Sequence, residues 1–233
     1  MGCDRGSVAH PPELLRDGKT EVLARIIRAK SPTGIRRALV VGCGSGVEAA
    51  ILSHALDAAV VGIDVVASFD SSVTSLVDLR EGDATALQFA AGEFDLVYSF
   101  HALEHIPEYS RALGEMRRVL ASDGCYCIGT PNRQRLVGYL GSKTATATDK
   151  LRWNAKDWRD RLAGRFTNDA GAHAGFAYEE LESELLRHFS SAENIGPRYY
   201  AESHPSRASS LGLVAGSGLG RYVFPAVYFF GRA

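Results

Sequence analysis

The chain has 233 residues, of which 45% are hydrophobic, and its formal net charge is −1. This length and apolar content suit one domain with its own core, and no run of about 18 apolar residues that would indicate a membrane-spanning helix occurs. The near-neutral charge also disfavours a protein whose main task is to coat nucleic acid.

Four segments at the N-terminal side predict helix and strand in turn. Residues 12–30 carry apolar side chains at helical spacing and predict an N-terminal helix. The next segment, RALVVGCGSG, is an apolar run that ends in glycines, which is typical of a buried parallel strand followed by a sharp turn. VEAAILSHAL then has helical propensity, and AAVVGIDVV predicts a second buried strand that ends in an acid.

The same pattern continues further along the chain. EFDLVYSF and GCYCIGT predict two more strands, and YSRALGEMRRVLA predicts a helix between them. Residues 178–188 predict a late helix, and SSAENIGPRYY and RYVFPAVYFFGRA predict terminal strands. Because strands and helices alternate, the sequence predicts an α/β fold with a doubly wound parallel sheet.

Residues 133–177 break this alternation, because they lack a clean strand and contain both tryptophans, Trp153 and Trp158. Between positions 111 and 165, twelve Lys and Arg residues stand against five Asp and Glu residues, an excess of seven positive charges. A solvated helical face is the first explanation, and an anion site is the alternative. Since an insertion after the fifth strand lies near the sheet edge where such domains bind ligands, we expect a substrate lid. Trp153, Trp158 and Phe176 could line an acceptor site or belong to the core.

The segment VVGCGSGVEAA places Gly42, Gly44 and Gly46 between a strand and a helix. Glycine adopts the backbone angles of such a turn and lets a ligand contact the main chain. Val47 takes the place that the nucleotide pattern G-x-G-x-x-G gives to its third glycine, so a purely structural turn is the alternative. Asp64 ends the next strand, where a carboxylate could accept hydrogen bonds from both hydroxyls of a ribose. This acid favours a nucleoside-binding site.

With these motifs the sequence resembles the class I S-adenosylmethionine-dependent methyltransferases, continuously over residues 36–132. VVGCGSG is similar to the first motif of that family, and VGIDVV is similar to the second, with the ribose-binding acid at Asp64. EGDATAL resembles the third motif, which would put the Asp83 side chain near the adenine amino group and the Ala84 backbone beside the ring. FDLVYSFHALEHIPE and EMRRVLASDGCYCIGTPN resemble the family's fourth and fifth strands with their neighbouring segments. Two departures are the short segment between the second and third motifs and the missing proline in TALQFAAGEFD.

The resemblance implies a Rossmann-like, mostly parallel seven-stranded sheet with an antiparallel last strand and a helical insertion after the fifth strand. It implies one methyltransferase domain over residues 1–233, with S-adenosylmethionine as donor and S-adenosylhomocysteine as product. The parts would be an N-terminal helical segment (1–35), a donor-binding core (36–132), a substrate lid (133–177), and a C-terminal helix with strands (178–233). The expected donor-site residues are Gly42, Cys43, Gly44, Gly46, Asp64, Val65, Asp83, Ala84, Ser99, Phe100 and His101.

The pentapeptide HALEH at residues 101–105 also fits the H-x-x-E-H signature of zinc peptidases. That site needs both histidines on one continuous helix, whereas His101 directly follows a predicted strand, so we reject the peptidase hypothesis. Glu104 and His105 are expected to begin the next helix. Methyltransferases that modify the terminal 2'-hydroxyl of small RNAs carry Glu-x-x-Glu-His at this place and a later histidine. A metal bound by Glu104, His105 and His173 is therefore an alternative to the expectation of no metal.

The cysteines bear on the cellular compartment. Cys125 and Cys127 are two residues apart in a predicted strand, which is too close for a routine disulfide, and this favours a reducing cytoplasm. The N-terminal segment MGCDRGS lacks the apolar region of a signal peptide. We therefore expect a cytoplasmic protein without a membrane partner.

Methyl transfer requires alignment of the acceptor with the donor methyl group and exclusion of water. If the acceptor is a hydroxyl, a base helps to remove its proton, and we expect His101, then His105, in that role because imidazole titrates near neutral pH. Both could instead be scaffold histidines. We predict methyl transfer to a small-molecule acceptor, at a hydroxyl oxygen. The alternatives are a metal-assisted 2'-O-methyltransferase of RNA ends and a donor-binding regulatory protein without turnover. The oligomeric state is not indicated by the sequence.

Overall fold

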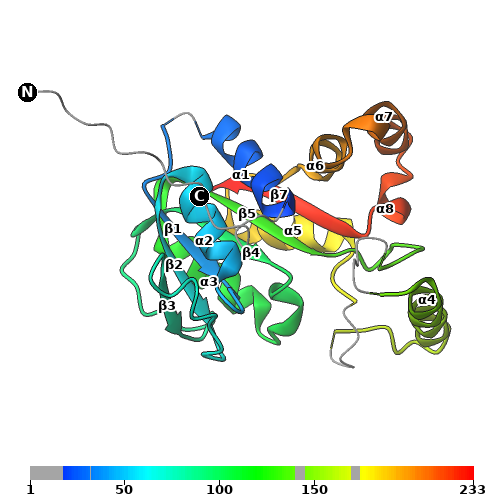
Figure 1. Cartoon of the computed structure of the whole chain (residues 1–233), viewed down its shortest axis with the longest axis horizontal. Helices are drawn as coiled ribbons and strands as arrows, with labels where there is room; N and C mark the ends of the chain where they lie inside the picture. The colour runs from blue at the N-terminus through cyan, green and yellow to red at the C-terminus, as the bar shows by residue number, and fades with distance from the viewer. Residues whose placement is uncertain (1–17, 32, 140–144, 169–173) are drawn as a thin grey trace, which may run out of the picture.

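The computed structural model describes residues 18–31, 33–139, 145–168 and 174–233. A seven-stranded sheet in the order β3-β2-β1-β4-β5-β7-β6 forms its centre (Figure 1). The strands are β1 (Arg37–Val41), β2 (Ala59–Asp64), β3 (Asp78–Glu81), β4 (Phe94–Phe100), β5 (Leu120–Pro131), β6 (Glu193–Asn194) and β7 (Ala226–Arg232). Neighbours β1 to β5 pair in parallel, whereas β7 is antiparallel to both β5 and β6. The predicted fold class, with its antiparallel last strand, is confirmed.

Helices cover both faces of the sheet. They are α1 (Gly18–Lys30), α2 (Val47–Leu56), α3 (Tyr109–Val119), α4 (Ala147–Leu162), α5 (Tyr178–His188), α6 (Gly196–Ser203), α7 (Ala208–Gly216) and α8 (Gly220–Val223), with 3-10 turns at Leu103–His105 and Pro205–Arg207. One hydrophobic core lies between the sheet and α1, α2 and α6, and a second lies between the sheet and α3 and α5. None of the helices in the described part of the chain is long and apolar enough to cross a bilayer.

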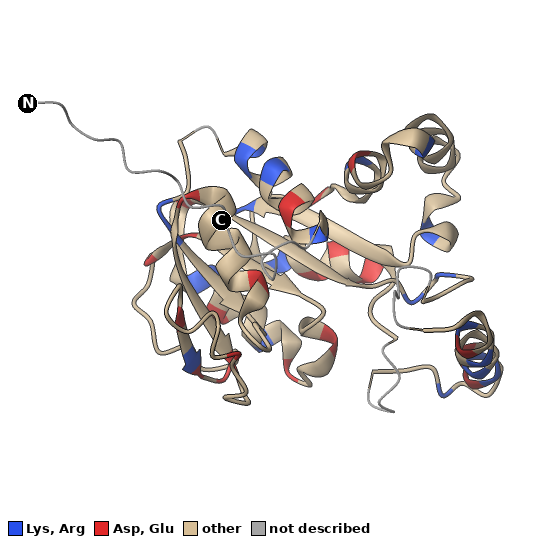
Figure 2. Ribbon diagram, viewed as in Figure 1, with Lys and Arg blue, Asp and Glu red and all other residues tan. Residues whose placement is uncertain are grey.

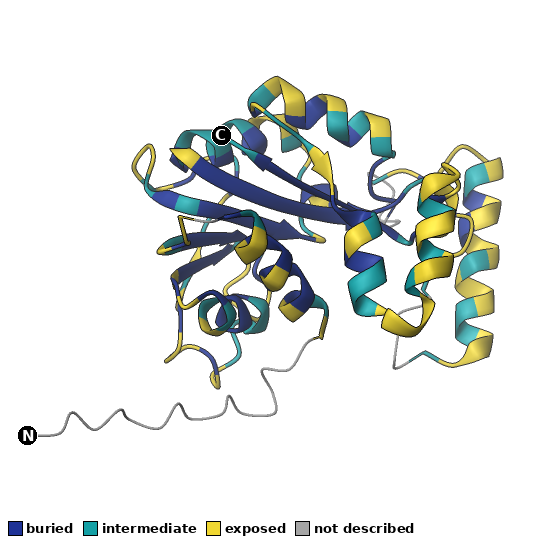
Figure 3. Ribbon diagram, turned by 90° about the horizontal axis from the view of Figure 1, so that it is seen from above, coloured by how far each residue is buried: buried dark blue, intermediate teal, exposed yellow. Residues whose placement is uncertain are grey.

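The central strands are apolar at consecutive positions because both of their faces are buried. Leu39 and Val97 point into the core under α3 and α5, whereas Val40 and Leu96 point into the core under α1 and α2. Successive side chains of a strand point to opposite faces, so a strand between two helical layers has no solvent-facing position. Figure 3 shows this as continuous burial along the middle of the sheet.

The prediction of a strand over residues 190–200 was wrong. Only Glu193–Asn194 pairs with β7, and α6 begins at Gly196. Pro197 stands in the first turn of this helix, where its fixed φ and missing N–H are tolerated. Tyr199 and Tyr200 are buried against the core, so these aromatic residues belong to a helix that packs on the sheet and not to a strand. Of the strand predicted over 221–233, only Ala226–Arg232 forms a strand, which is β7. The first residues of that segment, up to Val223, belong to α8.

The segment 133–177 contains α4 and, among its described residues, no strand of the sheet. Thr146 begins α4 with a capping box, in which its side chain accepts from the Asp149 N–H and the Asp149 carboxylate accepts from the Thr146 N–H. Phe176 is fully buried and packs edge-on against Tyr109, with ring centroids 5.0 Å apart. The alternative that Phe176 lines an acceptor site is therefore wrong. Trp153, in contrast, is exposed on α4.

Candidate functional site

The glycine loop, made of Gly42, Gly44 and Gly46 with the residues between them, joins β1 to α2 at the carboxyl edge of the sheet. All three glycines have positive φ, at 73°, 52° and 87°. A Cβ on Gly42 would overlap the side chain of Ala102, and one on Gly46 would overlap Leu79. A Cβ on Gly44 would meet nothing within 4 Å. Two glycines are thus required by packing, and Gly44 is the one that leaves open space beside the main chain.

Asp64 ends β2 and is half-buried. Its Oδ2 accepts a hydrogen bond from the Gly44 N–H at 2.8 Å, and its Oδ1 accepts one from the Val66 N–H at 3.1 Å. The Gly42 N–H donates to the Ile63 carbonyl oxygen at 2.9 Å. The end of β2 therefore holds the glycine loop in shape. Each carboxylate oxygen retains capacity for a further donor, because an ionised carboxylate offers about four acceptor positions.

Cys43 and Val65 flank this pair in different environments. Burial, together with the nearby Asp64 charge, raises the pKa of the Cys43 thiol to about 12, so this thiol is neutral at physiological pH. Val65 follows Asp64 with a largely exposed side chain. An exposed apolar side chain beside a carboxylate is a surface that a ring and a sugar can cover.

Asp83 lies on the loop after β3, at the same edge of the sheet. β3 pairs with β2 so that Glu81 stands opposite Asp64, and the Gly82 N–H donates to the Asp64 carbonyl oxygen at 2.9 Å. The exposed Asp83 carboxylate accepts from the Thr85 N–H and hydroxyl, both at 2.8 Å, and these bonds lower the pKa of Asp83. Asp83 is therefore ionised, and its Oδ1 already accepts two hydrogen bonds from its own loop. Ala84 beside it is buried.

Glu115 of α3 anchors the loop that carries Asp83. Its carboxylate accepts from the Leu87 N–H at 2.9 Å and from Arg118 at 2.8 Å, and Arg118 donates in turn to the Leu87 and Phe89 carbonyl oxygens at 2.8 Å. These bonds connect charged side chains of α3 to main-chain atoms of the loop. They fix the loop beside the sheet edge.

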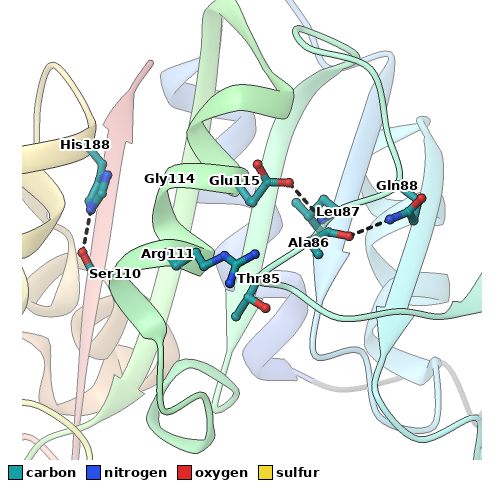
Figure 4. Close-up of a pocket in the computed structure, with 9 residues that line it drawn as sticks. All are labelled: Thr85, Ala86, Leu87, Gln88, Ser110, Arg111, Gly114, Glu115 and His188. Carbon is teal, nitrogen blue, oxygen red and sulfur yellow. Dashed lines mark hydrogen bonds between the residues drawn. The ribbon is translucent and has the colours of Figure 1, made fainter.

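An open groove of about 650 Å³ lies between this loop and α3 (Figure 4). Its lining comes from the loop, α3 and the end of α5: Thr85, Ala86, Leu87, Gln88, Ser110, Arg111, Gly114, Glu115 and His188. Ser110 and His188 bond to each other at 3.1 Å, and Glu115 is paired as described above. Neither the glycine loop nor Asp64 lines this groove, so it is not the predicted donor site.

Ser99 and Phe100 end β4 and point to opposite faces of the sheet. Ser99 is buried on the α3 side, and its hydroxyl has no hydrogen-bond partner among the described residues. Phe100 stacks on Tyr228 with centroids 5.5 Å apart. Their main chain, rather than the Ser99 side chain, borders the glycine loop, since Gly42 packs against the turn that follows at Ala102.

His101 occupies the turn after β4 with a positive φ of 53°, which is uncommon for a residue other than glycine. Its N–H donates to the Gly129 carbonyl oxygen at 2.9 Å, and its Nδ1 lies 3.2 Å from Glu104 Oε1. The Glu104 side chain is 0% exposed, whereas the His101 side chain is 43% exposed. If Nδ1 donates its proton to the buried carboxylate, Nε2 is left as the acceptor.

His105 lies near the same carboxylate oxygen, with its Nε2 4.0 Å from Glu104 Oε1. Glu104 Oε2 is buried without a hydrogen-bond partner among the described residues. Leu103–His105 is a single 3-10 turn, and α3 begins only at Tyr109. The expectation that Glu104 and His105 begin the next helix was therefore wrong. The absence of a continuous helix agrees with rejection of the peptidase hypothesis.

One of the three residues in the alternative metal site is not described by the structure. His173 lies outside the described residues, so its position relative to Glu104 and His105 stays a hypothesis. Within the described ranges, no group of three or more His, Cys, Asp or Glu residues could hold a metal ion.

Lys19 of α1 is a site neighbour that the sequence analysis missed. Its Nζ lies 3.7 Å from the centroid of the Phe100 ring and 2.6 Å from Glu48 Oε1 in the first turn of α2. A cation–π contact and an ion pair thus place a positive charge beside the end of β4. No local motif marks Lys19, because only the packing of α1 on the sheet brings it to this edge.

The sequence has relatives among methyltransferases. Residues 39–128 match the family profile described as "Methyltransferase domain". A protein of Mycolicibacterium smegmatis named "Probable S-adenosylmethionine-dependent methyltransferase" is 30% identical over 101 residues, which make up 42% of this chain and 39% of that protein. The match therefore spans about two fifths of that relative's length.

Solved structures share the fold at low sequence identity. Phosphoethanolamine N-methyltransferase 2 of Haemonchus contortus, in complex with S-adenosyl-L-methionine, aligns with a TM-score of 0.56 and 19% identity over 91% of this chain and 52% of that one. The cyclase SpnF aligns with a TM-score of 0.53 and 18% identity over 91% of this chain and 78% of that one. At this identity the similarity shows the fold alone, and one of the two proteins is named for a different reaction.

The glycine loop predicts unequal effects of two single substitutions. Gly44→Ala should lower the free energy of unfolding by about 1–2 kcal/mol, because alanine is strained at positive φ but meets open space. Gly42→Ala should cost about 1–3 kcal/mol more, because its Cβ also overlaps Ala102. Urea unfolding measures both values. Equal losses would contradict the assignment of Gly42 to packing and Gly44 to open space.

The Glu115 anchor predicts a pH-dependent contribution to stability. The bonds from Arg118, and then from the Leu87 N–H, lower the pKa of Glu115 below its ordinary value of 4.5. This contribution is present above that value and is lost as the pH falls through the folded-state pKa. Glu115→Gln should therefore cost about 1 kcal/mol at pH 7, since the amide keeps one acceptor.

Unfolding of wild type and Glu115→Gln across pH 3–7 tests this prediction. The gap between the two free energies should narrow as the pH falls below 4.5 and close once the Glu115 carboxylate is protonated in the folded state. A gap that stays constant over the whole range would show that ionisation of Glu115 does not contribute. Glu108→Gln, at an exposed acid of the same region, is the control.

Proposed function

We propose that this chain, a member of the class I S-adenosylmethionine-dependent methyltransferases by its sheet order and its match over residues 39–128, transfers the methyl group of S-adenosylmethionine to the hydroxyl oxygen of a small molecule. The donor part rests on the glycine loop with Asp64, and the acceptor part rests on the pair His101 and Glu104. Each part has its own support and its own test.

The edge of the sheet has the chemistry that the donor requires. Gly44 leaves open space beside the main chain, and both Asp64 oxygens can accept further hydrogen bonds, as the two hydroxyls of a ribose would supply. Val65 offers an apolar surface next to this acid. Asp83, on the adjacent loop, has the acceptor oxygens that an adenine amino group needs. The residues present therefore fit a nucleoside.

Lys19 extends this proposal to the amino-acid end of the donor. That end carries a carboxylate, and the Lys19 ammonium lies beside Phe100 and close to the glycine loop through its pairing with Glu48 in α2. Opposite charges attract strongly where water is partly excluded. We assign Lys19 to this carboxylate.

S-adenosylmethionine supplies a methyl group on a positively charged sulfur, which is a good leaving group. The chain then mainly has to orient the acceptor and exclude water, and orientation of this kind contributes about 7–11 kcal/mol in well-aligned systems. His101 Nε2 would take the hydroxyl proton of the acceptor. The buried Glu104 carboxylate would orient the imidazole through Nδ1.

An oxygen acceptor is favoured by this pair. A hydroxyl needs a base as it attacks, whereas an amine with a free lone pair can lose its proton after the transfer. His101 has the backbone strain, the buried carboxylate partner and the partial exposure that suit a base at the site edge. Three free, buried cysteines, Cys43, Cys125 and Cys127, support the cytoplasm as location.

The rival proposal is a protein that binds the donor and does not turn it over. The similarity to SpnF supports keeping it, because that protein shares the fold and is named a cyclase. Incubation with labelled S-adenosylmethionine and panels of phenols, alcohols and amines separates the two. Donor binding without methyl consumption across the panels would favour the rival. The metal-assisted RNA alternative has no support from the described residues.

Asp64→Ala should weaken donor binding by about 1.5–3 kcal/mol, which raises Kd roughly 10- to 150-fold, through lost charged hydrogen bonds. Calorimetry with S-adenosylmethionine measures this. Asp78→Ala is the control, because Asp78 lies on the neighbouring strand β3 and pairs with Arg80 instead. An affinity unchanged by Asp64→Ala would argue strongly against this donor site.

His101→Asn should slow methyl transfer about 100-fold or more while donor affinity is kept, because asparagine tolerates positive φ but is not a base. Single-turnover assays with an accepted hydroxyl substrate, together with donor calorimetry, measure both quantities. His105→Asn is the matched control and should have the smaller effect. An undiminished rate in His101→Asn would remove this residue as the base.

A further inference from the structure

Helix α4 has its polar and apolar faces reversed relative to a core-packing helix. Its buried residues are Asp157 and Asp160. Asp157 pairs with the buried Arg135 at 3.3 Å, and Arg161 donates to the Arg133 and Arg135 carbonyl oxygens at 2.6 and 3.0 Å. Leu151 and Leu162, in contrast, are 71% and 87% exposed. The helix is therefore held to the domain by charge and hydrogen bonds, whereas its two leucines are exposed.

The outward residues of α4 form two adjacent stripes. Leu151, Ala155, Trp158 and Leu162 follow one another at helical spacing and are all exposed, which makes one apolar stripe. Arg152, Lys156 and Arg159 are each one position further along the chain and form a basic stripe beside it. Lys156 and Arg159 also pair with the buried Asp160, at 2.8 and 3.9 Å, so this one acid is shared between two cations of the stripe and the stripe keeps a net positive charge. Figure 2 shows the dense charge on this helix.

The apolar stripe continues onto the neighbouring segment. The Trp158 indole N–H donates to the Leu136 carbonyl oxygen at 3.1 Å, and the Leu136 N–H donates to the Tyr222 carbonyl oxygen of α8 at 2.8 Å. Leu136, Val137, Tyr222 and Val223 are all exposed. We call these residues, with the two stripes of α4, the α4–α8 face. Helix α7, which follows α6 on the same end of the molecule (Figure 1), has no buried residue at all.

We propose that the α4–α8 face docks on an anionic lipid bilayer. A helix with Trp and Leu on one side and Lys and Arg on the adjacent side lies in the plane of a membrane interface, its apolar stripe among acyl chains and its cations at the headgroups. In this proposal no helix spans the membrane, in agreement with the described helices, and the proposal departs from the expectation of no membrane partner. The inference goes beyond the proposed function and does not depend on it.

Two other occupants fit the face less well. A second copy of the chain would cover the apolar stripe but would bring the basic stripes of both copies close together, which repel each other. A nucleic acid would pair with the basic stripe but would leave Leu151 and Leu162 without a contact. A bilayer satisfies both stripes at once.

The docking surface lies at the end of the molecule that carries the site edge. β5 runs parallel to β4, and the chain passes from the end of β5 through Leu136 to α4. The carboxyl ends of parallel strands meet at one edge of a sheet, so the glycine loop and the α4–α8 face lie toward the same edge. Docking would thus bring the site edge toward the membrane surface.

The intrinsic fluorescence of the chain gives a direct test, because Trp153 and Trp158 are its only two tryptophans and both lie on α4. The full chain is titrated with vesicles of phosphatidylcholine alone and of phosphatidylcholine with phosphatidylglycerol, and the bound fraction is measured by co-sedimentation. We expect a blue shift and binding with the anionic vesicles, weakened by salt. Absence of binding, or equal binding to both vesicle types, would overturn the proposal.

Variants assign the binding to the face. Leu151→Glu with Leu162→Glu should lower the partition coefficient about tenfold or more, because each leucine that would enter the bilayer is replaced by a charge. Arg152→Gln with Arg159→Gln should lower it by about tenfold, mainly at low salt. The matched controls are Leu76→Glu and Arg36→Gln, at exposed residues away from the face, and they should bind like the wild type.

Further measurements distinguish bilayer docking from the two other partners and from loss of the fold. Circular dichroism and donor calorimetry on each variant show whether the domain and its donor site persist, so a failure here is distinct from a failure of the proposed function. A dimer in size-exclusion chromatography with light scattering that Leu151→Glu with Leu162→Glu dissociates, without vesicle binding, would overturn the proposal in favour of a second copy. Oligonucleotide binding lost only in the arginine variant would overturn it in favour of nucleic acid.

Discussion

The hydrogen bond from the Gly44 N–H to the Asp64 carboxylate is the interaction on which the candidate site depends. It joins the loop after β1 to the end of β2, two strands that are adjacent in the sheet. The same carboxylate therefore shapes the loop and keeps acceptor capacity for a ligand. Because the loop is already formed, binding does not have to supply the entropy of ordering it.

A second contact connects this pair to the turn after β4. Gly42 packs directly against Ala102, the residue that follows His101, so the glycine loop and the turn after β4 support one another. The positive φ of His101 is maintained by this packing and by the bond from its N–H to Gly129. A strained residue beside a buried carboxylate oxygen that has no partner among the described residues is the combination that functional sites tend to retain.

Helix α4 is attached to the domain by interactions of a different kind from those in the core. The central strands bury apolar side chains on both faces, whereas α4 is attached through Asp157, Arg135 and hydrogen bonds to the segment after β5. Charged and amide side chains can hold a helix in place while its leucines remain outside. An amphipathic pattern therefore predicts a helix correctly but does not say which of its faces meets the protein.

The fold and the glycine turn could be predicted because they depend on local sequence. Continuous apolar runs predict strands buried on both faces, and the bounds of α2 and α5 follow from helical periodicity. Lys19 beside Phe100 and the pairing of Glu104 with His101 were decided by tertiary packing, since no local pattern fixes which side chains meet. The segment at 190–200 shows the same limit, because aromatic residues suit a strand and a helix equally until a partner surface selects one. The sequence by itself thus determined the sheet and its glycine turn, and only the tertiary structure decided which charges face the site and which apolar residues face outward, because that choice depends on contacts between distant segments.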